Sequence, residues 1–500
     1  MKLMKLQNGT DVRGIAAEGI ADEAVNFRPD DANLIAQAFV LWLAKKKGVE
    51  KESLTIGVGH DSRITAEILK EGILKGIMGQ GAKAMDSHLA STPSMFMSTI
   101  YDEFQFDGSI MITASHLPFN RNGMKFFDNE GGLEHDDITE ILTIAEGLEV
   151  VTTDAVASDV DIISCYSTHL VDIIREKVNA DNYEEPLKGL KIVVDAGNGA
   201  GGFFVEKVLK PLGADTTGSQ FLEPDGTFPN HIPNPENKQA MEAIKSAVLA
   251  NKADLGIIFD TDVDRMSAVL SNGSEVNRDA IIAMMAAILA EEYPGSTVVT
   301  DSVTSDRLQE FLEGNLGMKQ HRFKRGYKNV INECKRLNEA GIVSPLAIET
   351  SGHGALKENY YLDDGAFLAV KLLIFAAKAK KENRAVGSYI EALKPAFEET
   401  EMRFKIKCEE FGAYGKEVLK AFEERAKEKG LMVVPNSFEG IRISFKGEDI
   451  KGWLLLRMSL HDPLLPLNME GEREGDIDRM KALVAELLDG FDQLDLSALK

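Results

Sequence analysis

The sequence predicts an α/β protein built from several domains. A strand-like apolar run that enters a polar loop and then a helix occurs three times, beginning near residues 54, 190 and 296. This repeated order is typical of α/β domains. The length of 500 residues also exceeds what one hydrophobic core usually serves. We therefore expect three similar α/β domains, followed by a module of different character.

Each repeat has its own loop. In the first, residues 54–58 predict a strand and residues 66–78 a helix that ends at glycines. In the second, the strand at 190–195 enters a glycine cluster. That cluster allows a dinucleotide-binding interpretation, but it lacks the G-x-G-x-x-G order, so a tight turn into a helix is preferred. In the third, residues 296–300 predict a strand before a helix at 306–312.

The last hundred residues predict a smaller α+β module. Helices are expected at 414–429 and 477–488, and strands at 431–434, 441–445 and 453–456. These strands follow one another closely, so we expect hairpins rather than crossovers.

Composition excludes several classes of protein. The chain carries 56 basic and 80 acidic residues, a formal charge of −24, which makes nucleic acid and anionic membranes poor partners. The longest apolar run, at 280–290, is too short to span a bilayer, and the first residues lack the apolar core of a signal peptide. The three cysteines are widely separated, which favours a reducing compartment. We expect a cytoplasmic protein.

The stretch at 113–127 is the first candidate for chemistry. An apolar run leads into Ser115 and His116, a turn follows, and a short strand returns with Lys125. A hydroxyl, an imidazole and an ammonium group therefore gather at one edge of a sheet, where functional loops concentrate. An ordinary polar turn is the alternative.

Three carboxylates form the second candidate. Asp260, Asp262 and Asp264 follow an apolar strand, and alternate residues of an extended chain point the same way. Their mutual repulsion calls for a cation, and oxygen ligands favour Mg²⁺ or Ca²⁺. An EF-hand is excluded, because Arg265 and Ser271 stand where its glycine and its last acidic ligand are required. The alternative is a solvated acidic turn.

Four further loops carry polar groups suited to anions or sugar hydroxyls. Arg13 lies between two glycines, and Lys328 belongs to a basic cluster that alone would be a solvated turn. The other two loops combine a charged side chain, a hydroxyl and an imidazole: Glu349, Ser351 and His353 in one, and Arg457, Ser459 and His461 in the other. A single ligand that contacts all these loops would lie between domains.

Together these motifs resemble the α-D-phosphohexomutase family, which includes phosphoglucomutase and phosphomannomutase. Residues 113–118 match its T-A-S-H-x-P phosphoserine loop, 260–265 its D-x-D-x-D-R metal loop, and 349–353 its E-x-S-G-H sugar loop. The resemblance covers essentially the whole chain. It implies three similar α/β domains with mixed sheets and a smaller C-terminal α+β domain around a central cleft. The domains would span residues 1–155, 156–277, 278–397 and 398–500.

The resemblance also implies an activity, the interconversion of hexose 1-phosphate and hexose 6-phosphate through a phosphoserine and a sugar bisphosphate, which also serves as primer. Ser115 would carry the phosphoryl group and would bind Mg²⁺ together with the three aspartates. Arg13, His116 and Lys125 would line the reacting phosphate and assist proton transfer. The implied substrate-binding residues are Arg265, Lys328, Glu349, Ser351, His353, Arg457, Ser459 and His461.

One loop departs from the family pattern. The family usually reads R-x-S-G-T-E-P, but here Leu460 and His461 replace its glycine and threonine. A sugar-phosphate sensor without catalysis is therefore one alternative. A haloacid dehalogenase-like sugar phosphatase is another, with Asp260 as nucleophile and Asp363 and Asp364 as the later acidic pair, but it leaves the 113–125 stretch without a role.

Overall fold

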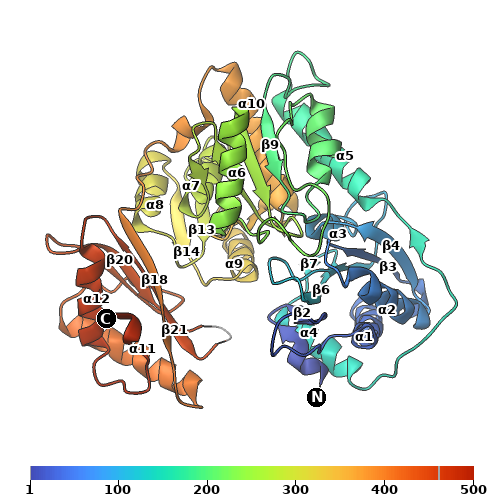
Figure 1. Cartoon of the computed structure of the whole chain (residues 1–500), viewed down its shortest axis with the longest axis horizontal. Helices are drawn as coiled ribbons and strands as arrows, with labels where there is room; N and C mark the ends of the chain where they lie inside the picture. The colour runs from blue at the N-terminus through green and yellow to red at the C-terminus, as the bar shows by residue number, and fades with distance from the viewer. Residues whose placement is uncertain (1, 460–461, 500) are drawn as a thin grey trace. The chain divides into compact units, whose positions relative to one another are not determined.

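The computed structural model describes residues 2–459 and 462–499, and these form two compact units. The first unit comprises Met1–Asn277 and Ser351–Val386, and the second comprises Arg278–Thr350 and Gly387–Lys500 (Figure 1). No helix in the described ranges has both the length and the apolar character needed to cross a membrane.

The N-terminal part of the first unit is built on an eight-stranded mixed sheet in the order β1-β2-β6-β5-β3-β4-β8, with β7 paired to β6. Its strands are β1 (Gln7–Asn8), β2 (Asp11–Ile15), β3 (Thr55–His60), β4 (Lys83–Leu89), β5 (Gly108–Ile112), β6 (Arg121–Asp128), β7 (Gly131–Gly132) and β8 (Ser158–Asp159). Strands β3, β4 and β5 are parallel, whereas β6 runs antiparallel to both β5 and β2. The predicted strand and loop at 109–127 are therefore β5, a turn and β6.

Helices pack beside this sheet. They are α1 (Pro29–Lys47), α2 (Ala66–Gly79), α3 (Thr92–Met97) and α4 (His135–Ala145). Helix α1 begins where Asp31 accepts a hydrogen bond from the Arg28 amide at 2.9 Å, and it ends at Gly48 in the left-handed conformation. Its buried face carries Phe39, whose ring lies 5.1 Å from that of Phe126 on β6. Packing on the apolar face of the sheet thus stabilises α1.

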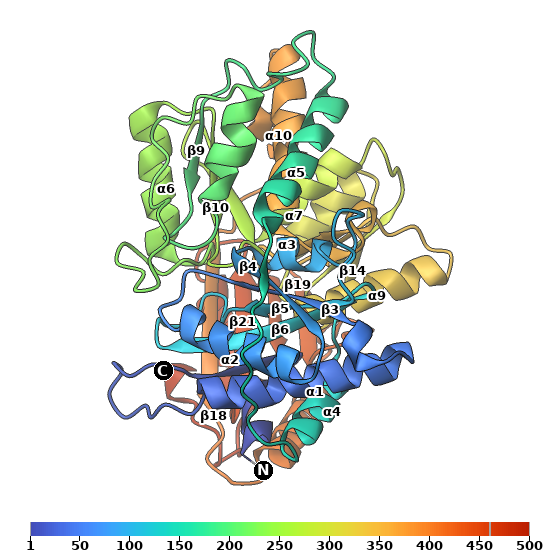
Figure 2. The ribbon, with the colours of Figure 1, turned by 90° about the vertical axis from the view of Figure 1, so that its right-hand side faces the viewer.

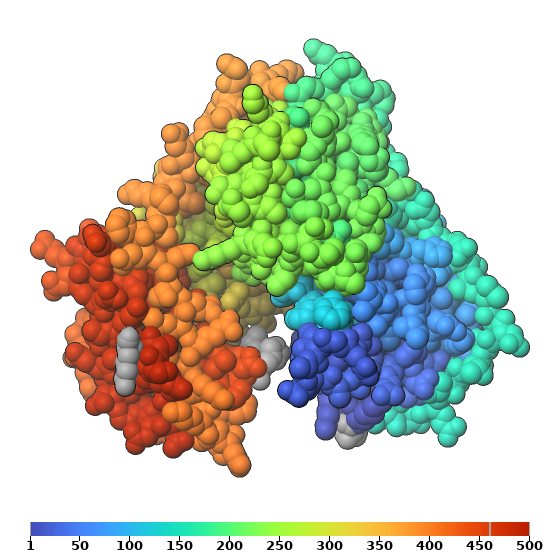
Figure 3. All heavy atoms as spheres, viewed as in Figure 1, coloured from blue at the N-terminus to red at the C-terminus, as the bar shows by residue number. Residues whose placement is uncertain are grey.

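The rest of the first unit is built on a four-stranded sheet in the order β12-β11-β10-β9. Its elements are β9 (Ile192–Asp195), β10 (Leu255–Phe259), β11 (Met266–Leu270), β12 (Glu275–Val276), α5 (Ile162–Val178), α6 (Lys238–Asn251) and α10 (Gly365–Lys381). Figure 2 shows α6 on one side of β9 and β10 and α10 on the other. In the space-filling view, the yellow-green atoms around α6 lie on the face turned towards the viewer (Figure 3). A short pair, β16 (Gly354–Leu356) and β17 (Leu362–Asp363), also belongs to this unit.

The glycine cluster is a tight turn, as preferred from the sequence. Ala200 donates its amide to the Thr261 carbonyl at 2.8 Å, and a Cβ at Gly199 would lie 2.5 Å from that oxygen. The turn therefore packs directly against the loop that carries the three aspartates. The helix expected after it is not an α-helix, because Phe204–Leu209 is π-helical and Lys210–Leu212 is a 3₁₀ turn with Pro211 in it.

A buried ion pair lies at the end of β9. His231 Nε2 is 3.1 Å from Asp195, and both side chains are almost fully buried. Burial lowers the pKa of His231, but the hydrogen bond and charge of Asp195 outweigh it and hold that pKa above its ordinary value of 6.5. A raised histidine pKa contributes stability that is fully present below the unfolded pKa and is lost as pH rises through the folded pKa.

This pair predicts a pH-dependent stability. The melting temperature of the protein should fall as the pH rises from about 6 through the raised pKa of His231, where this residue loses its proton. In His231→Gln that part of the fall should disappear, and loss of the cation beside Asp195 should cost about 3 kcal/mol or more at pH 6. Thermal unfolding across this range measures both. Parallel curves for the two proteins would contradict the assignment.

The second unit contains a parallel set of strands and a C-terminal sheet. Its first part comprises α7 (Asp279–Leu289), β13 (Thr297–Thr300), α8 (Asp306–Glu310), β14 (Lys319–Arg322), α9 (Tyr327–Glu339) and β15 (Leu346–Ile348). Strand β13 pairs in parallel with both β14 and β15. The helix expected at 306–312 changes into a π-helix at Phe311–Asn315.

The C-terminal sheet is antiparallel, in the order β18-β21-β20-β19. Its elements are β18 (Glu398–Lys405), α11 (Phe411–Glu428), β19 (Ile441–Lys446), β20 (Lys451–Leu456), β21 (Leu464–Gly471) and α12 (Asp476–Leu487). Phe404, Phe422 and Leu467 are fully buried in its core. The strand predicted at 431–434 is wrong: only Val433 forms a bridge, to Ile443, and Pro435, which lacks an amide donor, follows.

Candidate active site

Ser115 stands directly beyond the end of β5 in an unusual backbone conformation. Its φ is +50°, a left-handed value that L-residues rarely adopt, and its amide donates to Thr113 Oγ1 at 2.9 Å. The residue is 1% exposed. Such strain persists only where the surroundings impose it, and it occurs mostly at functional sites.

The three aspartates occupy the hairpin between β10 and β11. Every residue of β10 is buried, and the loop turns through Val263 at φ +68°. The Arg265 amide closes the turn by donating to Asp260 Oδ1 at 3.2 Å. One carboxylate oxygen of each of Asp260, Asp262 and Asp264 lies within 4.8 Å of the others, and all three residues are buried. The acidic turn is therefore not solvated.

The serine and the carboxylates meet. Ser115 Oγ donates to Asp260 Oδ2 at 3.0 Å and accepts from Arg265 Nη2 at 3.3 Å. His116 Nδ1 is 3.4 Å from the same hydroxyl. Two motifs that are 145 residues apart in the sequence thus share one site within the first unit.

Lys125 reaches the carboxylates from β6. It is paired across the sheet with Met111 on β5, and its Nζ lies 2.5 Å from Asp264 and 3.1 Å from Asp262. Thr92, at the start of α3, also donates its hydroxyl to Asp262 at 2.5 Å. The predicted grouping of Ser115, His116 and Lys125 at one edge of the sheet is found in the structure.

His353 and Arg13 complete this side of the site. His353 Nδ1 pairs with Asp363 and lies 3.8 Å from Asp264, while its backbone bridges that of Arg265. Arg13 on β2 pairs with Asp11 at 2.8 Å. Ser351 is buried, and its Oγ has no hydrogen-bond partner among the described residues.

Burial and neighbouring charges shift the pKa values of Asp260 and Asp264 in opposite directions. Burial, together with Asp264 and Asp262, raises the pKa of Asp260 well above its ordinary value. Burial also opposes ionisation of Asp264, but the charges of Lys125, His353 and Arg265 hold its pKa below the ordinary value.

The pKa of His116 is shifted mainly by neighbouring positive charges. The charge of Arg265, then burial and the charge of Arg13, lowers the pKa of His116 to about 2. This imidazole is therefore neutral beside Ser115.

The donor set fits a hard divalent cation. Asp262 Oδ1 and Asp264 Oδ1 are buried and, within the part of the chain that the structure describes, lack hydrogen-bond partners. Buried carboxylate oxygens without hydrogen bonds are costly unless a cation takes them up. Four oxygen donors, three carboxylates and the Ser115 hydroxyl, are those that Mg²⁺ prefers.

The remaining candidate residues lie in the second unit. Glu349 accepts from the Gly326 amide at 2.7 Å, two residues before Lys328 on α9. Arg457 lies 3.3 Å from Glu439, and Ser459 Oγ accepts from the Asp462 amide at 3.2 Å. His461 lies outside the described residues.

Sequence analysis missed several residues of these clusters. Glu439 accepts from Ser302 Oγ at 2.6 Å and from the Arg325 amide at 2.9 Å, as well as facing Arg457. Asp363 was assigned only to the phosphatase alternative. No motif marks Glu439, because two of its partners, Ser302 and Arg325, are more than a hundred residues away in the sequence.

Comparison with known proteins agrees with this arrangement. Three domain models described as phosphoglucomutase/phosphomannomutase alpha/beta/alpha domains I, II and III match residues 4–150, 166–273 and 277–394. A phosphoglucomutase/phosphomannomutase from Thermococcus kodakarensis is 30% identical over 477 residues, covering 94% of this chain and 95% of that protein. A phosphoglucomutase from Neisseria gonorrhoeae is 27% identical over 474 residues, with 94% of each covered.

A solved structure shows the same fold. The crystal structure of a phosphoglucomutase/phosphomannomutase family protein from Burkholderia thailandensis superposes with a TM-score of 0.76 over 96% of this chain and 97% of that one, at 23% identity. Fold and site thus define a sugar-phosphate-transforming α/β enzyme. The chain belongs to the α-D-phosphohexomutase family.

Proposed function

We propose that this hexose phosphate mutase, an isomerase, acts through phosphorylated Ser115. The phosphoserine would transfer its phosphoryl group to the free end of a hexose 1- or 6-phosphate, and the resulting bisphosphate, which also serves as primer, would return its other phosphoryl group to Ser115. The supporting observation is the Ser115 hydroxyl, held 3.0 Å from Asp260 and 3.3 Å from Arg265. The cytoplasm remains the compartment that we propose from composition.

Asp260, Asp262, Asp264 and Ser115 are the residues that would hold Mg²⁺. When bound, the ion would offset the negative charge of the phosphoryl group, which is the main requirement of phosphoryl transfer. Arg265 already contacts the Ser115 oxygen and would bind the phosphoryl oxygens from the other side. Arg13, His116 and Lys125 would line the reacting phosphate and help move the proton of the sugar hydroxyl.

The other end of the substrate needs its own contacts. Lys328, Glu349, Ser351 and His353 would bind sugar hydroxyls, which require both donors and acceptors. Arg457, Ser459 and His461 would bind the phosphate that does not react. Glu439 lies 3.3 Å from Arg457, so a bound phosphate would compete with this carboxylate as the partner of the guanidinium.

The phosphoserine can be tested by intact mass. Incubation with glucose 1,6-bisphosphate should add one phosphoryl group to the wild type and none to Ser115→Ala. A mass gain that persists in Ser115→Ala would reject Ser115 as the acceptor.

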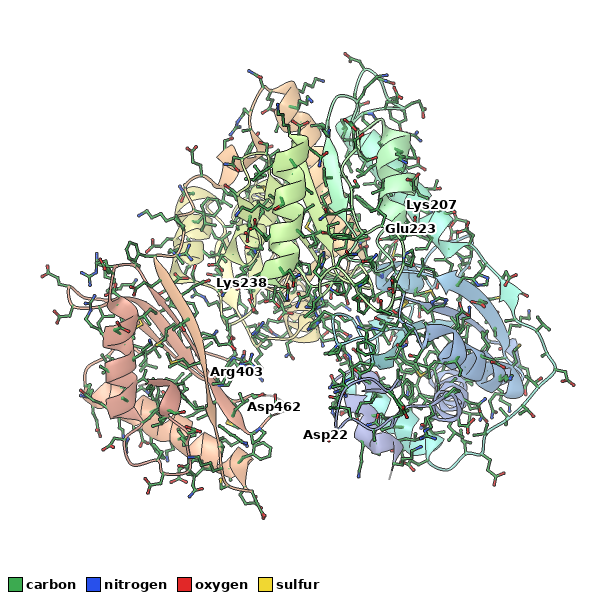
Figure 4. The ribbon with its side chains drawn as sticks, in the orientation of Figure 1. Asp22, Lys207, Glu223, Lys238, Arg403 and Asp462 are labelled. Carbon is green, nitrogen blue, oxygen red and sulfur yellow. The ribbon has the colours of Figure 1, made fainter. Side chains whose placement is uncertain are left out.

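Arg457 provides a test of the second phosphate site. Arg457→Gln should raise KM for glucose 1-phosphate about 10- to 100-fold, because a charge-assisted hydrogen bond contributes about 1.5–3 kcal/mol. Arg403→Gln is a matched control in the same domain: it is exposed on β18 and pairs with Glu401 (Figure 4). Steady-state kinetics of both variants measure the effect. An equal KM in the wild type and Arg457→Gln would remove this residue from the site.

A further inference from the structure

Arg63 holds the backbone of the loop that carries Ser115. Its guanidinium donates four hydrogen bonds to main-chain carbonyl oxygens, three in that loop and one at the first residue of β6. Nη2 donates to Ser115 at 2.5 Å and Leu117 at 2.6 Å, and Nη1 donates to Pro118 at 2.8 Å and Arg121 at 2.9 Å. The side chain is completely buried.

Three of these bonds satisfy carbonyls in a segment that belongs to no strand. The chain leaves β5 after Ile112 and re-enters the sheet at Arg121, so Ser115, Leu117 and Pro118 lie outside the strands, although the Pro118 carbonyl also accepts from the Arg121 amide at 3.0 Å. A buried carbonyl without a donor is costly. The planar guanidinium fork can serve several carbonyls at once, whereas an ammonium group cannot do so in the same geometry.

The guanidinium is itself fixed in place. The Arg63 amide donates to Asp61 Oδ1 at 2.9 Å, and Arg63 Nε lies 3.4 Å from Asp61 Oδ2. The Phe228 ring lies 5.3 Å from the guanidinium carbon. Asp61 in turn donates its amide to the Ile112 carbonyl at 3.1 Å. The Asp61–Arg63 segment is thus anchored to the strand end from which the Ser115 loop departs.

We propose that Arg63 is a positioning residue for phosphoryl transfer: it holds Ser115 at its left-handed φ and so directs Oγ towards Asp260 and Arg265. The inference rests on the proposed role of Ser115. Without the hydrogen bond from Arg63 to its carbonyl, Ser115 relaxes towards an ordinary φ, and its Oγ moves away from the carboxylates. The sugar and distal phosphate contacts, made by other residues, remain.

Arg63→Lys tests this positioning role. A displacement of about 1 Å at a reacting atom lowers kcat about 100-fold. We expect a loss of that size with KM for glucose 1-phosphate within about threefold of wild type, because substrate binding is unchanged. The rate at which Ser115 gains its phosphoryl group from glucose 1,6-bisphosphate, followed by intact mass, should fall in parallel.

Arg425→Lys is the matched control. Arg425 also donates to two main-chain carbonyls, those of Leu487 and Asp489 at 2.8 Å each, and stacks on Phe491 at 5.1 Å, but it belongs to the second unit, whereas Ser115 belongs to the first. Its replacement should lower the melting temperature and leave kcat within about threefold of wild type. A loss of kcat that is confined to Arg63→Lys therefore indicates a change in the position of Ser115 rather than a general loss of stability.

A second variant covers the case in which Arg63→Lys does not fold. Thr113→Val keeps the shape of the side chain but removes the acceptor of the Ser115 amide, and it should lower kcat about tenfold at unchanged KM. If Arg63→Lys folds and has the wild-type kcat, the inference is wrong. If only Thr113→Val folds, a wild-type kcat in that variant overturns the inference. If Ser115→Ala remains active, the proposed function fails instead, so the two failures are distinguishable.

Discussion

Replacing Ser115 with alanine is expected to reduce kcat by roughly 10⁶-fold, the scale on which loss of a covalent nucleophile acts. The other groups of the site cannot replace it. Asp260 still accepts a hydrogen bond from the Arg265 amide in this variant, and Lys125 is paired with two carboxylates. The measurement is the initial rate of conversion of glucose 1-phosphate, with glucose 1,6-bisphosphate present as primer.

Ser109→Ala is the control for this substitution. Ser109 is fully buried on the same strand, β5, and its hydroxyl donates to the Met95 carbonyl at 2.6 Å rather than facing the carboxylates. Its loss should cost about 1 kcal/mol of stability and leave kcat close to that of the wild type. A Ser115→Ala protein as active as Ser109→Ala would refute the phosphoserine mechanism.

Removal of divalent cations is expected to lower kcat by about 10³-fold or more, since a metal ion supplies several kcal/mol of charge stabilisation in phosphoryl transfer. Activity should return on titration with Mg²⁺. The same titration should raise the melting temperature in the absence of substrate, because the cation relieves the repulsion among three buried carboxylates. Both effects should be lost in Asp262→Asn, which removes the charge and keeps the size of the side chain.

Asp86→Asn is the control for the metal prediction. Asp86 lies with His88 and Asp159 in another group of possible ligands, but Lys70 is only 3.1 Å from its carboxylate. The Mg²⁺ dependence of melting temperature and of rate should be unchanged in this variant. Turnover that survives chelation in the wild type, or a Mg²⁺ response retained by Asp262→Asn, would exclude the carboxylate site.

The sequence predicted the elements whose apolar pattern is simple. Strands β5, β9 and β10 are buried along their whole length, so their runs of apolar residues were recognisable. Strand β18 was not predicted, because its exposed residues are charged and alternate with buried ones only towards its end. The strand expected at 431–434 failed for the opposite reason: it is apolar, but it meets no partner strand beyond one bridge.

The same distinction applies to the site. Ser115 and the three aspartates were predictable, since each motif is local and carries its own chemistry. The four hydrogen bonds from Arg63 to main-chain carbonyls were not predictable, because backbone groups have no residue signature. The hydrogen bond between Glu439 and Ser302 was not predictable either, because the two residues are 137 positions apart. Local sequence motifs thus identify the reacting side chains, whereas the residues that hold those side chains in place are recognised only from the tertiary structure.

Gly199 has no side chain, yet it packs directly against the loop that carries the three aspartates. Any Cβ there would lie 2.5 Å from the Thr261 carbonyl, and Thr261 separates two of the carboxylates. In a library of random variants this position would behave like an active-site residue, intolerant even of alanine, although it contributes no functional group. A map of mutational tolerance would therefore mark more positions as essential than the reacting side chains alone.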